Sequence, residues 1–340
     1  MNNFNYVSAV DAGGALASKG AGSFIAGGTN LLDLMKENVA RPATLVDINL
    51  LPFADVEALA DGGLRLGALA RNAATAYHPL VHDGYPLISA AILAGASAQI
   101  RNMASNGGNL LQRTRCVYFY DTGTPCNKRE PGSGCSAIGG YARQHAILGA
   151  SEHCIATHPS DLCVALSALG AVVHVDSPRG GRHIPFADFH RLPEGRPDQD
   201  TTLAPDELIL HIDVPASGQF ARNSAYLKLR ERASYAFALV SVAAALDVGA
   251  DGLIREARIA VGGVAHKPWR KPEAEAGLAG QAAGPEAFGR AADLLLAGAI
   301  PQGEGLGSNA FKIPLARRAI VRALQTAAGG TVHNTGEDMR

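Results

Sequence analysis

The residues best suited to chemistry in this chain are five cysteines, at positions 116, 126, 135, 154 and 163. Nine, eight, eighteen and eight residues separate successive cysteines, whereas zinc fingers and ribbons usually place ligand pairs two to four residues apart, so zinc is disfavoured. A disulfide framework is also unattractive, because five is an odd number and a chain of 340 residues can build a core without such bridges. Two interpretations stay open on spacing alone: a four-iron four-sulfur cluster on one irregular loop, and scattered thiols that pack as small hydrophobes.

The loop between Cys116 and Cys135 is rich in residues that form turns, so its backbone can wrap a compact inorganic core. These residues are Asp121, Gly123, Pro125, Asn127, Pro131, Gly132 and Gly134. Basic side chains nearby could offset the negative charge of a cluster held by thiolates, and they are Arg113, Arg115, Lys128 and Arg129.

Two glycine turns are suited to holding a phosphate. In the first, a short apolar run from residue 23 enters Gly27-Gly28, and a helical pattern follows over residues 31–39. The second is Gly107-Gly108-Asn109, just before the cysteine loop. Such turns expose successive N–H groups, and the missing side chains let a diphosphate come close. The first turn matches neither the GxGxxG fingerprint nor a Walker loop, so an ordinary glycine-rich connection is the alternative interpretation. The presence of a second glycine turn makes that alternative less favoured.

The hydrophobic pattern predicts the elements that must position these turns. Helices are expected over residues 87–99, 162–169, 286–296 and 310–324. Asp161 could accept hydrogen bonds from a polyol, although Ser160-Asp161 before an apolar run is also an ordinary helix cap. Residues 226–232 alternate like a strand with Lys228, Arg230 and Arg232 on one face, which on its own indicates a solvated sheet surface. Residues 239–248 and 253–264 flank a glycine-containing turn and predict a β-hairpin.

Composition limits the possible functions. A net charge of -1 with 18% charged residues argues against a nucleic-acid binder, which would normally carry a basic face. No stretch approaches the ~20 apolar residues of a membrane span. Residues 1–6 have neither the basic region nor the apolar run of a signal peptide. Taken alone, the composition predicts a soluble intracellular protein of two or three domains.

The order of four motifs resembles a known family. The motifs are AGGTN at residues 26–30, ASNGGNL at 104–110, SDL at 160–162, and KLRER at 228–232 followed by Ser234-Tyr235-Ala236. Together they resemble the FAD-binding subunit of the molybdenum hydroxylase (xanthine dehydrogenase) family, from about residue 4 to about residue 325. Within that family, residues 112–116 and 125–135 resemble the insertion of the periplasmic aldehyde oxidoreductase branch, a bacterial heterotrimer. This insertion is more specific than the glycine turns and favours the cluster over scattered thiols.

The resemblance implies a role for each matching position. The turn around the FAD pyrophosphate would be formed by Ala26, Gly27, Gly28, Thr29, Asn30 and Leu31, and the second FAD turn by Ser105, Gly108 and Asn109. Asp161 matches the acidic residue that contacts the ribityl chain or ribose, Lys228 the lysine near the flavin ring, and Ile209 an apolar contact of the adenine. The cluster ligands would be Cys116, Cys126, Cys135 and Cys154, while the apolar neighbours of Cys163 favour a packing role.

The implied fold class is α+β, of the vanillyl-alcohol-oxidase type (PCMH-type), with a two-subdomain FAD-binding fold plus a small α+β C-terminal domain. Residues 1–60 and 61–220 would form the two subdomains, with the iron–sulfur insertion at about 112–156. Residues 221–330 would form the C-terminal domain, and residues 331–340 a disordered tail.

The resemblance further implies an oxidoreductase subunit that transfers electrons within an aldehyde-oxidising heterotrimer. A large subunit with the molybdenum cofactor would oxidise aldehyde with water to a carboxylic acid, and a small subunit with 2Fe-2S clusters would pass the electrons to FAD and an external acceptor. This chain would not oxidise aldehyde on its own. Co-export with a signal-bearing small subunit implies a periplasmic location, with the cytoplasm as the alternative. Two other functions stay open: the flavin subunit of a hydroxybenzoyl-CoA type reductase, and a non-enzymatic metal-binding interaction module.

Overall fold

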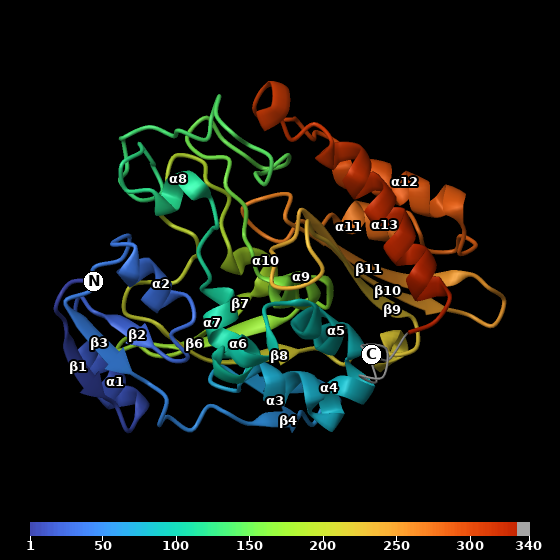
Figure 1. The fold of residues 1–340 in the computed structure, drawn as a ribbon. Helices are drawn as coiled ribbons and strands as arrows, with labels where there is room; N and C mark the ends of the chain where they lie inside the picture. The colour runs from blue at the N-terminus through green and yellow to red at the C-terminus, as the bar shows by residue number, and fades with distance from the viewer. Residues whose placement is uncertain (332–340) are drawn as a thin grey trace.

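The structure is a computed structural model that describes residues 1–331, so the expected disordered tail lies, except for Thr331, outside the described residues. The strands of the described residues form three sheets. These sheets follow one another from left to right across Figure 1, in the order of the sequence.

The N-terminal sheet is parallel, with strand order β1-β3-β2. Its strands are β1 (Asn5–Ser8), β2 (Ser23–Ile25) and β3 (Thr44–Asp47), and its helices are α1 (Ala12–Lys19) and α2 (Leu31–Lys36). Parallel neighbours need a crossover connection, which explains why a helix follows each of the first two strands. Asp11 starts α1 by accepting a hydrogen bond of 2.7 Å from the Gly14 N–H. The first glycine turn therefore lies between β2 and α2, as predicted.

The middle sheet is antiparallel, with order β4-β5-β8-β6-β7. Its strands are β4 (Val56–Ala58), β5 (Leu64–Gly67), β6 (Val172–Asp176), β7 (Arg182–Pro185) and β8 (Leu208–Val214). Alternate residues such as Leu66, Val173 and Ile212 pack in one core with helices α5 (Pro86–Ala94) and α9 (Asp161–Ala168). Shorter helices complete this part: α3 (Asn72–Tyr77), α4 (Pro79–Gly84), α6 (Ala98–Met103), α7 (Asn106–Leu110) and α10 (Phe186–Phe189).

The C-terminal sheet is antiparallel, with order β11-β10-β9. Its strands are β9 (Ser224–Leu229), β10 (Val240–Val248) and β11 (Ile254–Gly262), and its helices are α11 (Pro272–Ala276), α12 (Pro285–Leu296) and α13 (Lys312–Ala328). Short 3₁₀ turns lie at η1 (Gly218–Phe220) and η2 (Gly305–Gly307). Figure 1 shows α12 and α13 together over this sheet, where Val242 packs in one core with Phe288 and Ile320. The predicted hairpin is confirmed, since β10 pairs with β11 across a turn in which Gly252 has φ +78°.

Residues 111–160 form a long loop between α7 and α9 whose helical segment is α8 (Val117–Tyr120); it lies at the upper left of Figure 1. Local backbone hydrogen bonds and side chains, rather than a sheet, hold its turns. Asn127 Oδ1 accepts hydrogen bonds from the N–H groups of Gly132 and Gly134 (3.1 and 2.8 Å). Arg129 Nη1 donates to the carbonyls of Tyr118 and Phe119 (2.8 and 2.9 Å). The loop thus has a defined shape of its own.

Two expectations about single elements are wrong. The helix expected over residues 87–99 is interrupted after α5, because Ala96 has φ +51° and Ser97 caps α6 by accepting from the Ile100 N–H. The strand expected over residues 226–232 ends at Leu229. Lys228 does not face solvent, since its side chain is only 4% exposed. Both errors arise because local periodicity does not detect an interruption or a neighbour that comes from another part of the chain.

Candidate functional site

The first glycine turn packs directly on the backbone that leads into the second. A Cβ on Gly27 would lie 1.9 Å from the Met103 backbone oxygen, so this position has no room for a side chain. Gly28 has φ +70°, in the left-handed region that favours glycine. At the second turn, the Gly107 N–H donates to the Ala68 carbonyl (2.8 Å), and a Cβ on Gly107 would lie 3.2 Å from that residue. Both turns are therefore fixed by close backbone packing.

A cavity of about 460 Å³ runs along the first turn to strand β8. The predicted FAD residues that line it are Ala26, Gly27, Gly28, Thr29, Asn30, Leu31, Ser105, Gly108 and Ile209. Phe24, Leu111 and Leu208 add apolar wall. Apolar wall beside bare backbone suits a planar base that carries a diphosphate.

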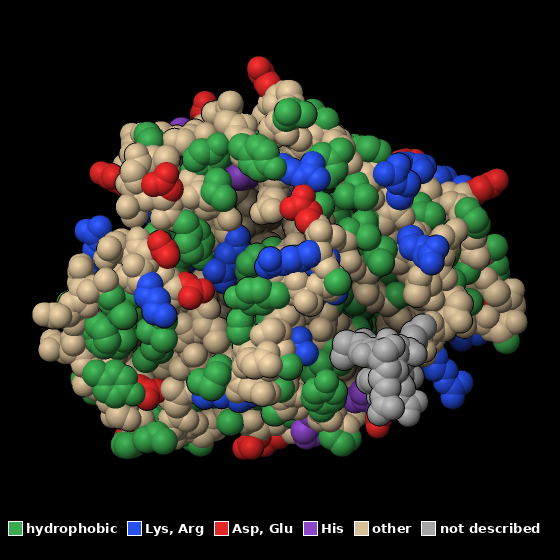
Figure 2. All heavy atoms as spheres, viewed as in Figure 1, with side chains coloured by type: hydrophobic (Ala, Val, Ile, Leu, Met, Phe, Trp, Pro, Cys, Tyr) green, Lys and Arg blue, Asp and Glu red, His purple; other side chains and the backbone are tan. Residues whose placement is uncertain are grey.

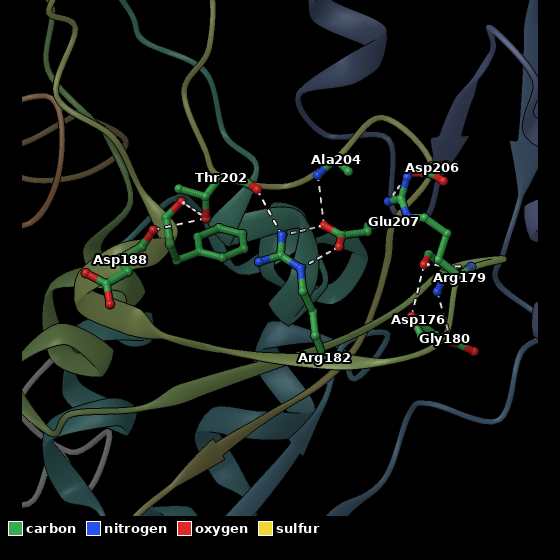
Figure 3. A network of polar contacts seen from close by, with 11 residues as sticks. Asp176, Arg179, Gly180, Arg182, Asp188, Thr202, Ala204, Asp206 and Glu207 are labelled. Carbon is green, nitrogen blue, oxygen red and sulfur yellow. Dashed lines mark hydrogen bonds and ion pairs between the residues drawn. The ribbon is translucent and has the colours of Figure 1, made fainter.

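Glu207, which lines the same cavity, is held by a polar network between β7 and the segment just before β8 (Figure 3). Arg182 Nη2 donates to Glu207 Oε2 (2.8 Å) and to the Thr202 carbonyl (2.9 Å), and the Ala204 N–H donates to Glu207 Oε2 (2.8 Å). The hydrogen bond from Arg182 is the largest cause that holds the pKa of Glu207 below its ordinary value. The network fixes the segment that leads into β8, and so fixes the position of Ile209.

A second cavity, also of about 460 Å³, adjoins the first, since Thr29 and Asn30 line both. The other predicted FAD residues, Asn109, Asp161 and Lys228, line this second cavity. All twelve residues predicted to contact FAD therefore line one two-part cavity.

Residues from α9, β9 and the end of α5 meet at an ion pair in the second cavity. Lys228 Nζ lies 2.7 Å from Asp161 Oδ2 and donates to the Ala94 carbonyl (3.1 Å). Tyr226 Oη donates to Asp161 Oδ1 (2.7 Å), and burial is the largest cause that raises the pKa of Tyr226 well above its ordinary value. A carboxylate has about four lone-pair positions, so Asp161 can still accept a hydrogen bond from a ligand hydroxyl.

Asn30 supplies the strongest indication of a bound group. Its Oδ1 accepts a hydrogen bond from the Arg113 backbone N–H (3.0 Å), while its Nδ2 is buried and has no partner among the described residues. A buried donor without a partner costs about 1–3 kcal/mol. Because Asn30 lines both cavities, a phosphate oxygen there would satisfy this donor, so the residues present fit FAD.

Asn109 also makes hydrogen bonds within the protein, and its predicted contact with FAD stays a prediction. Its Nδ2 donates to Asn72 Oδ1 (2.6 Å), and its Oδ1 accepts from Gln112 Nε2 (2.8 Å) and Ser160 Oγ (3.2 Å). The residue is 9% exposed, and its side-chain amide is already bonded at both its nitrogen and its oxygen. In the structure Asn109 therefore joins the second turn to the start of α9.

Several residues of the second cavity were not predicted as flavin-side residues. Figure 2 shows a hollow near the centre of this face with basic and acidic side chains around it. Arg115, Glu231, Arg232, Tyr235 and Phe237 line the second cavity. Arg115 was considered only as a counter-charge for a cluster, yet its guanidinium carbon lies 4.7 Å from the centre of the Phe237 ring. The motif at residues 234–236 was the available signal, since it lies within this group.

Cys116, Cys126, Cys135 and Cys154 line a separate small pocket inside the loop 111–160. Burial raises the pKa of Cys116 to about 11. A hydrogen bond between the thiols of Cys135 and Cys154 lowers the pKa of Cys135 to about 6 and raises that of Cys154. Within residues 1–331, none of these four cysteines belongs to a group of three metal-ligating side chains whose atoms lie within 4.8 Å of one another. At these cysteines the described residues therefore show no site for a single metal ion, and this geometry does not support the predicted 4Fe-4S cluster.

Lys128 brings a buried positive charge to the cysteine pocket. Its side chain is 1% exposed, its Nζ donates to the Pro197 carbonyl (2.7 Å), and it pairs with Asp200. Arg113 Nε lies 2.6 Å from Asp200 Oδ2. Burial alone would raise the pKa of Asp200, but the charges of Lys128 and Arg113 outweigh it and hold this pKa well below the ordinary value. Two cations therefore share one carboxylate beside the four thiols.

Comparison with known proteins agrees with this architecture. Residues 2–217 match the FAD binding domain in molybdopterin dehydrogenase, and residues 224–327 match the CO dehydrogenase flavoprotein C-terminal domain. The chain is 50% identical over 305 residues to the aldehyde oxidoreductase FAD-binding subunit PaoB of Escherichia coli (strain K12), covering 89% of this chain and 91% of that protein. It is 29% identical over 283 residues to the nicotine 6-hydroxylase medium subunit of Paenarthrobacter nicotinovorans, covering 81% and 79%. The carbon monoxide dehydrogenase structure from Hydrogenophaga pseudoflava superposes with a TM-score of 0.75 at 25% identity, covering 96% of this chain and 98% of that one.

The fold and the two-part cavity define an FAD-binding oxidoreductase subunit. The chain belongs to the molybdenum hydroxylase family, as its FAD-binding medium subunit. The predicted α+β fold class is thereby confirmed, whereas the predicted subdomain boundaries stay predictions. Across residues 1–331, no helix is both long enough and apolar enough to cross a bilayer.

Proposed function

We propose that this chain is the FAD-containing electron-transfer subunit of a molybdenum-dependent aldehyde oxidoreductase. The observation that carries the proposal is the 50% identity to an aldehyde oxidoreductase FAD-binding subunit over 89% of the chain. The partners would be a large subunit with the molybdenum cofactor, a small subunit with 2Fe-2S clusters, and an external electron acceptor. The large subunit would convert aldehyde and water to a carboxylic acid.

FAD, when bound, accepts electrons and releases them singly or in pairs. The residues of this chain bind and orient it. Gly27 and Gly28 leave the backbone bare for the diphosphate, and Asn30 Nδ2 supplies a buried donor. Lys228 and Asp161 hold the other part of the cavity in place through their ion pair. These cavity residues serve to hold FAD, so a partner subunit would carry out the chemistry on the aldehyde.

We also propose that Cys116, Cys126, Cys135 and Cys154 bind a four-iron four-sulfur cluster. The support is that all four thiols line one pocket and that Lys128 adds a buried positive charge. In such a cluster each iron takes one thiolate, so the ligand sulfurs surround an inorganic core rather than a single ion. The thiols therefore need not approach one another as closely as the ligands of one ion do.

Purification of the complex through a tag on this chain tests the electron-transfer proposal. The expected result is co-purification of two further subunits, with molybdenum, FAD and iron, and aldehyde oxidation by the complex. The isolated chain should bind FAD and be reduced by dithionite without oxidising aldehyde. Aldehyde turnover by the isolated chain would contradict the proposal. A thioester reduction activity in place of aldehyde oxidation would favour the hydroxybenzoyl-CoA type reductase, and a colourless zinc-loaded protein would favour the interaction module.

A periplasmic location by co-export with a signal-bearing partner is a further part of the proposal. Fractionation of the native host should find the assembled complex in the periplasm. Recovery of this chain only from the cytoplasm would contradict it.

A further inference from the structure

The outer face of the middle sheet carries a row of three histidines that no part of the proposed function uses. His174 on β6 is directly opposite His183 on β7 and His211 on β8. Neighbouring residues along these strands, such as Val173 and Ile212, face the core, so the three imidazoles share the opposite face. The rings are close, with centroids 4.4 Å apart for His174 and His183 and 4.3 Å for His174 and His211.

A carboxylate completes this group. His174 Nε2 lies 3.0 Å from Asp213 Oδ2, and His211 Nε2 lies 3.9 Å from Asp213 Oδ1. One ligand atom from each of His174, His211 and Asp213 lies within 4.8 Å of the others. The side chains are only 17–19% exposed, and His211 Nε2 is buried without a hydrogen-bond partner among the described residues.

We propose that His174, His211 and Asp213 bind one divalent transition-metal ion of the zinc class. Imidazole nitrogens and carboxylate oxygens bind Zn²⁺ at about 2.0–2.2 Å, and two such atoms at a tetrahedral angle stand about 3.3–3.6 Å apart. The observed separations, 3.0 Å from His174 to Asp213 Oδ2 and 3.9 Å from His211 to Asp213 Oδ1, lie on either side of that value, and one ligand atom from each residue lies within 4.8 Å of the others. Water would fill the remaining position.

Neighbouring side chains orient the proposed metal ligands through hydrogen bonds. His183 Nδ1 lies 2.8 Å from His174 Nδ1, a contact that orients the His174 ring and leaves Nε2 toward the carboxylate. Arg65 donates two hydrogen bonds of 2.8 Å to Asp213 and holds its plane. The positive charge of Arg65 opposes a cation, so the two imidazoles must provide most of the affinity. The ion would join β6 to β8, and its binding should stabilise the sheet. None of the three proposed ligands lines the FAD cavity or the cysteine pocket.

Equilibrium dialysis of the purified full chain against micromolar Zn²⁺, with bound zinc measured by mass spectrometry, tests the proposal. The wild-type chain should bind one more zinc ion than His211→Gln or Asp213→Asn. His82→Gln is the matched control, because His82 Nδ1 lies 2.7 Å from Asp83 Oδ1 but His82 belongs to no such group of three within residues 1–331. This variant should bind zinc as the wild type does. Zinc should also raise the melting temperature of the wild type and of His82→Gln, but not that of the two site variants. Equal zinc binding by wild type and both site variants would overturn the proposal.

A second measurement does not depend on how well the variants fold. Anomalous diffraction at the zinc edge from zinc-treated wild-type crystals should show a peak between His174, His211 and Asp213. A peak only at the cysteine pocket, or none on this face of the sheet, would overturn the proposal.

Discussion

Replacing Gly28 by valine should weaken FAD binding about five- to thirtyfold. Gly28 has φ +70°, where an L residue loses roughly 1–2 kcal/mol and a β-branched residue is a clear outlier. The new Cβ would lie 2.9 Å from Leu32 Cδ1, but that is the end of a flexible side chain, so backbone strain decides the cost. If the turn relaxes to a negative φ, FAD must restore the strained form on binding, and about 1–2 kcal/mol of affinity is lost.

Gly280 provides the matched control for this prediction. It has φ +74°, and a Cβ there would have nothing within 4 Å, so Gly280→Val carries the same kind of strain away from the cavity. Fluorescence titration of the flavin-free proteins with FAD should give weaker binding for Gly28→Val and wild-type affinity for Gly280→Val. Wild-type affinity in both variants, or the same loss in both, would refute the reasoning. In the assembled complex, Gly28→Val should slow turnover with an external acceptor and leave reduction of the molybdenum centre intact.

Two further predictions concern the cysteine loop and Asp200, which pairs with two of its basic side chains. Cys126→Ser should lower the iron content of the purified protein and Cys163→Ser should not, because Cys163 lies fully buried in α9 away from the pocket; full iron retention in Cys126→Ser would remove the ligand assignment. Asp200→Asn should destabilise the fold by about 2–4 kcal/mol at pH 7, somewhat less than for a wholly buried pair because the Asp200 side chain is 25% exposed. Because the pKa of Asp200 is lowered in the fold, its contribution to stability is present above about pH 4 and is lost as the pH falls. The free energy of unfolding in urea should therefore differ less between pH 7 and pH 3 for Asp200→Asn than for wild type. Asp293→Asn, which removes an exposed pair with Arg317, should cost under about 1 kcal/mol, and an equal loss in both variants would contradict the prediction.

Elements with a strong local pattern could be predicted from the sequence. The hairpin of β10 and β11 and the helices α12 and α13 follow from periodicity and glycine turns, and the structure has them within a few residues of the expected bounds. The break between α5 and α6 could not be predicted in this way, since the apolar pattern continues across it. Arg101 Nη1 donates to the Gly95 carbonyl (2.7 Å), a contact that forms only once the chain has already turned.

The parts of the site that depend on residues far apart in the chain could not be predicted from the sequence either. The glycine turns could be located by motif because their chemistry is local. The pairs Arg182–Glu207 and Lys128–Asp200 join residues 25 and 72 positions apart, and nothing in either neighbourhood indicates its partner. The histidine row was missed for the same reason, because only the register of β6, β7 and β8 brings its members together.

The cysteine loop and the flavin turn are joined by a continuous set of contacts, which bears on how the loop must be tested. Asn30 of the first turn accepts a hydrogen bond from the Arg113 backbone, and the Arg113 side chain pairs with Asp200, which also holds Lys128 at the cysteine pocket. A cysteine variant that disorders the loop can therefore weaken FAD binding without any electron passing through the loop. Loss of FAD from such a variant is a packing effect. A role in electron transfer requires instead that a variant which keeps both FAD and iron, such as a conservative change at Lys128, alter the reduction potential of the iron signal and the rate of flavin oxidation together.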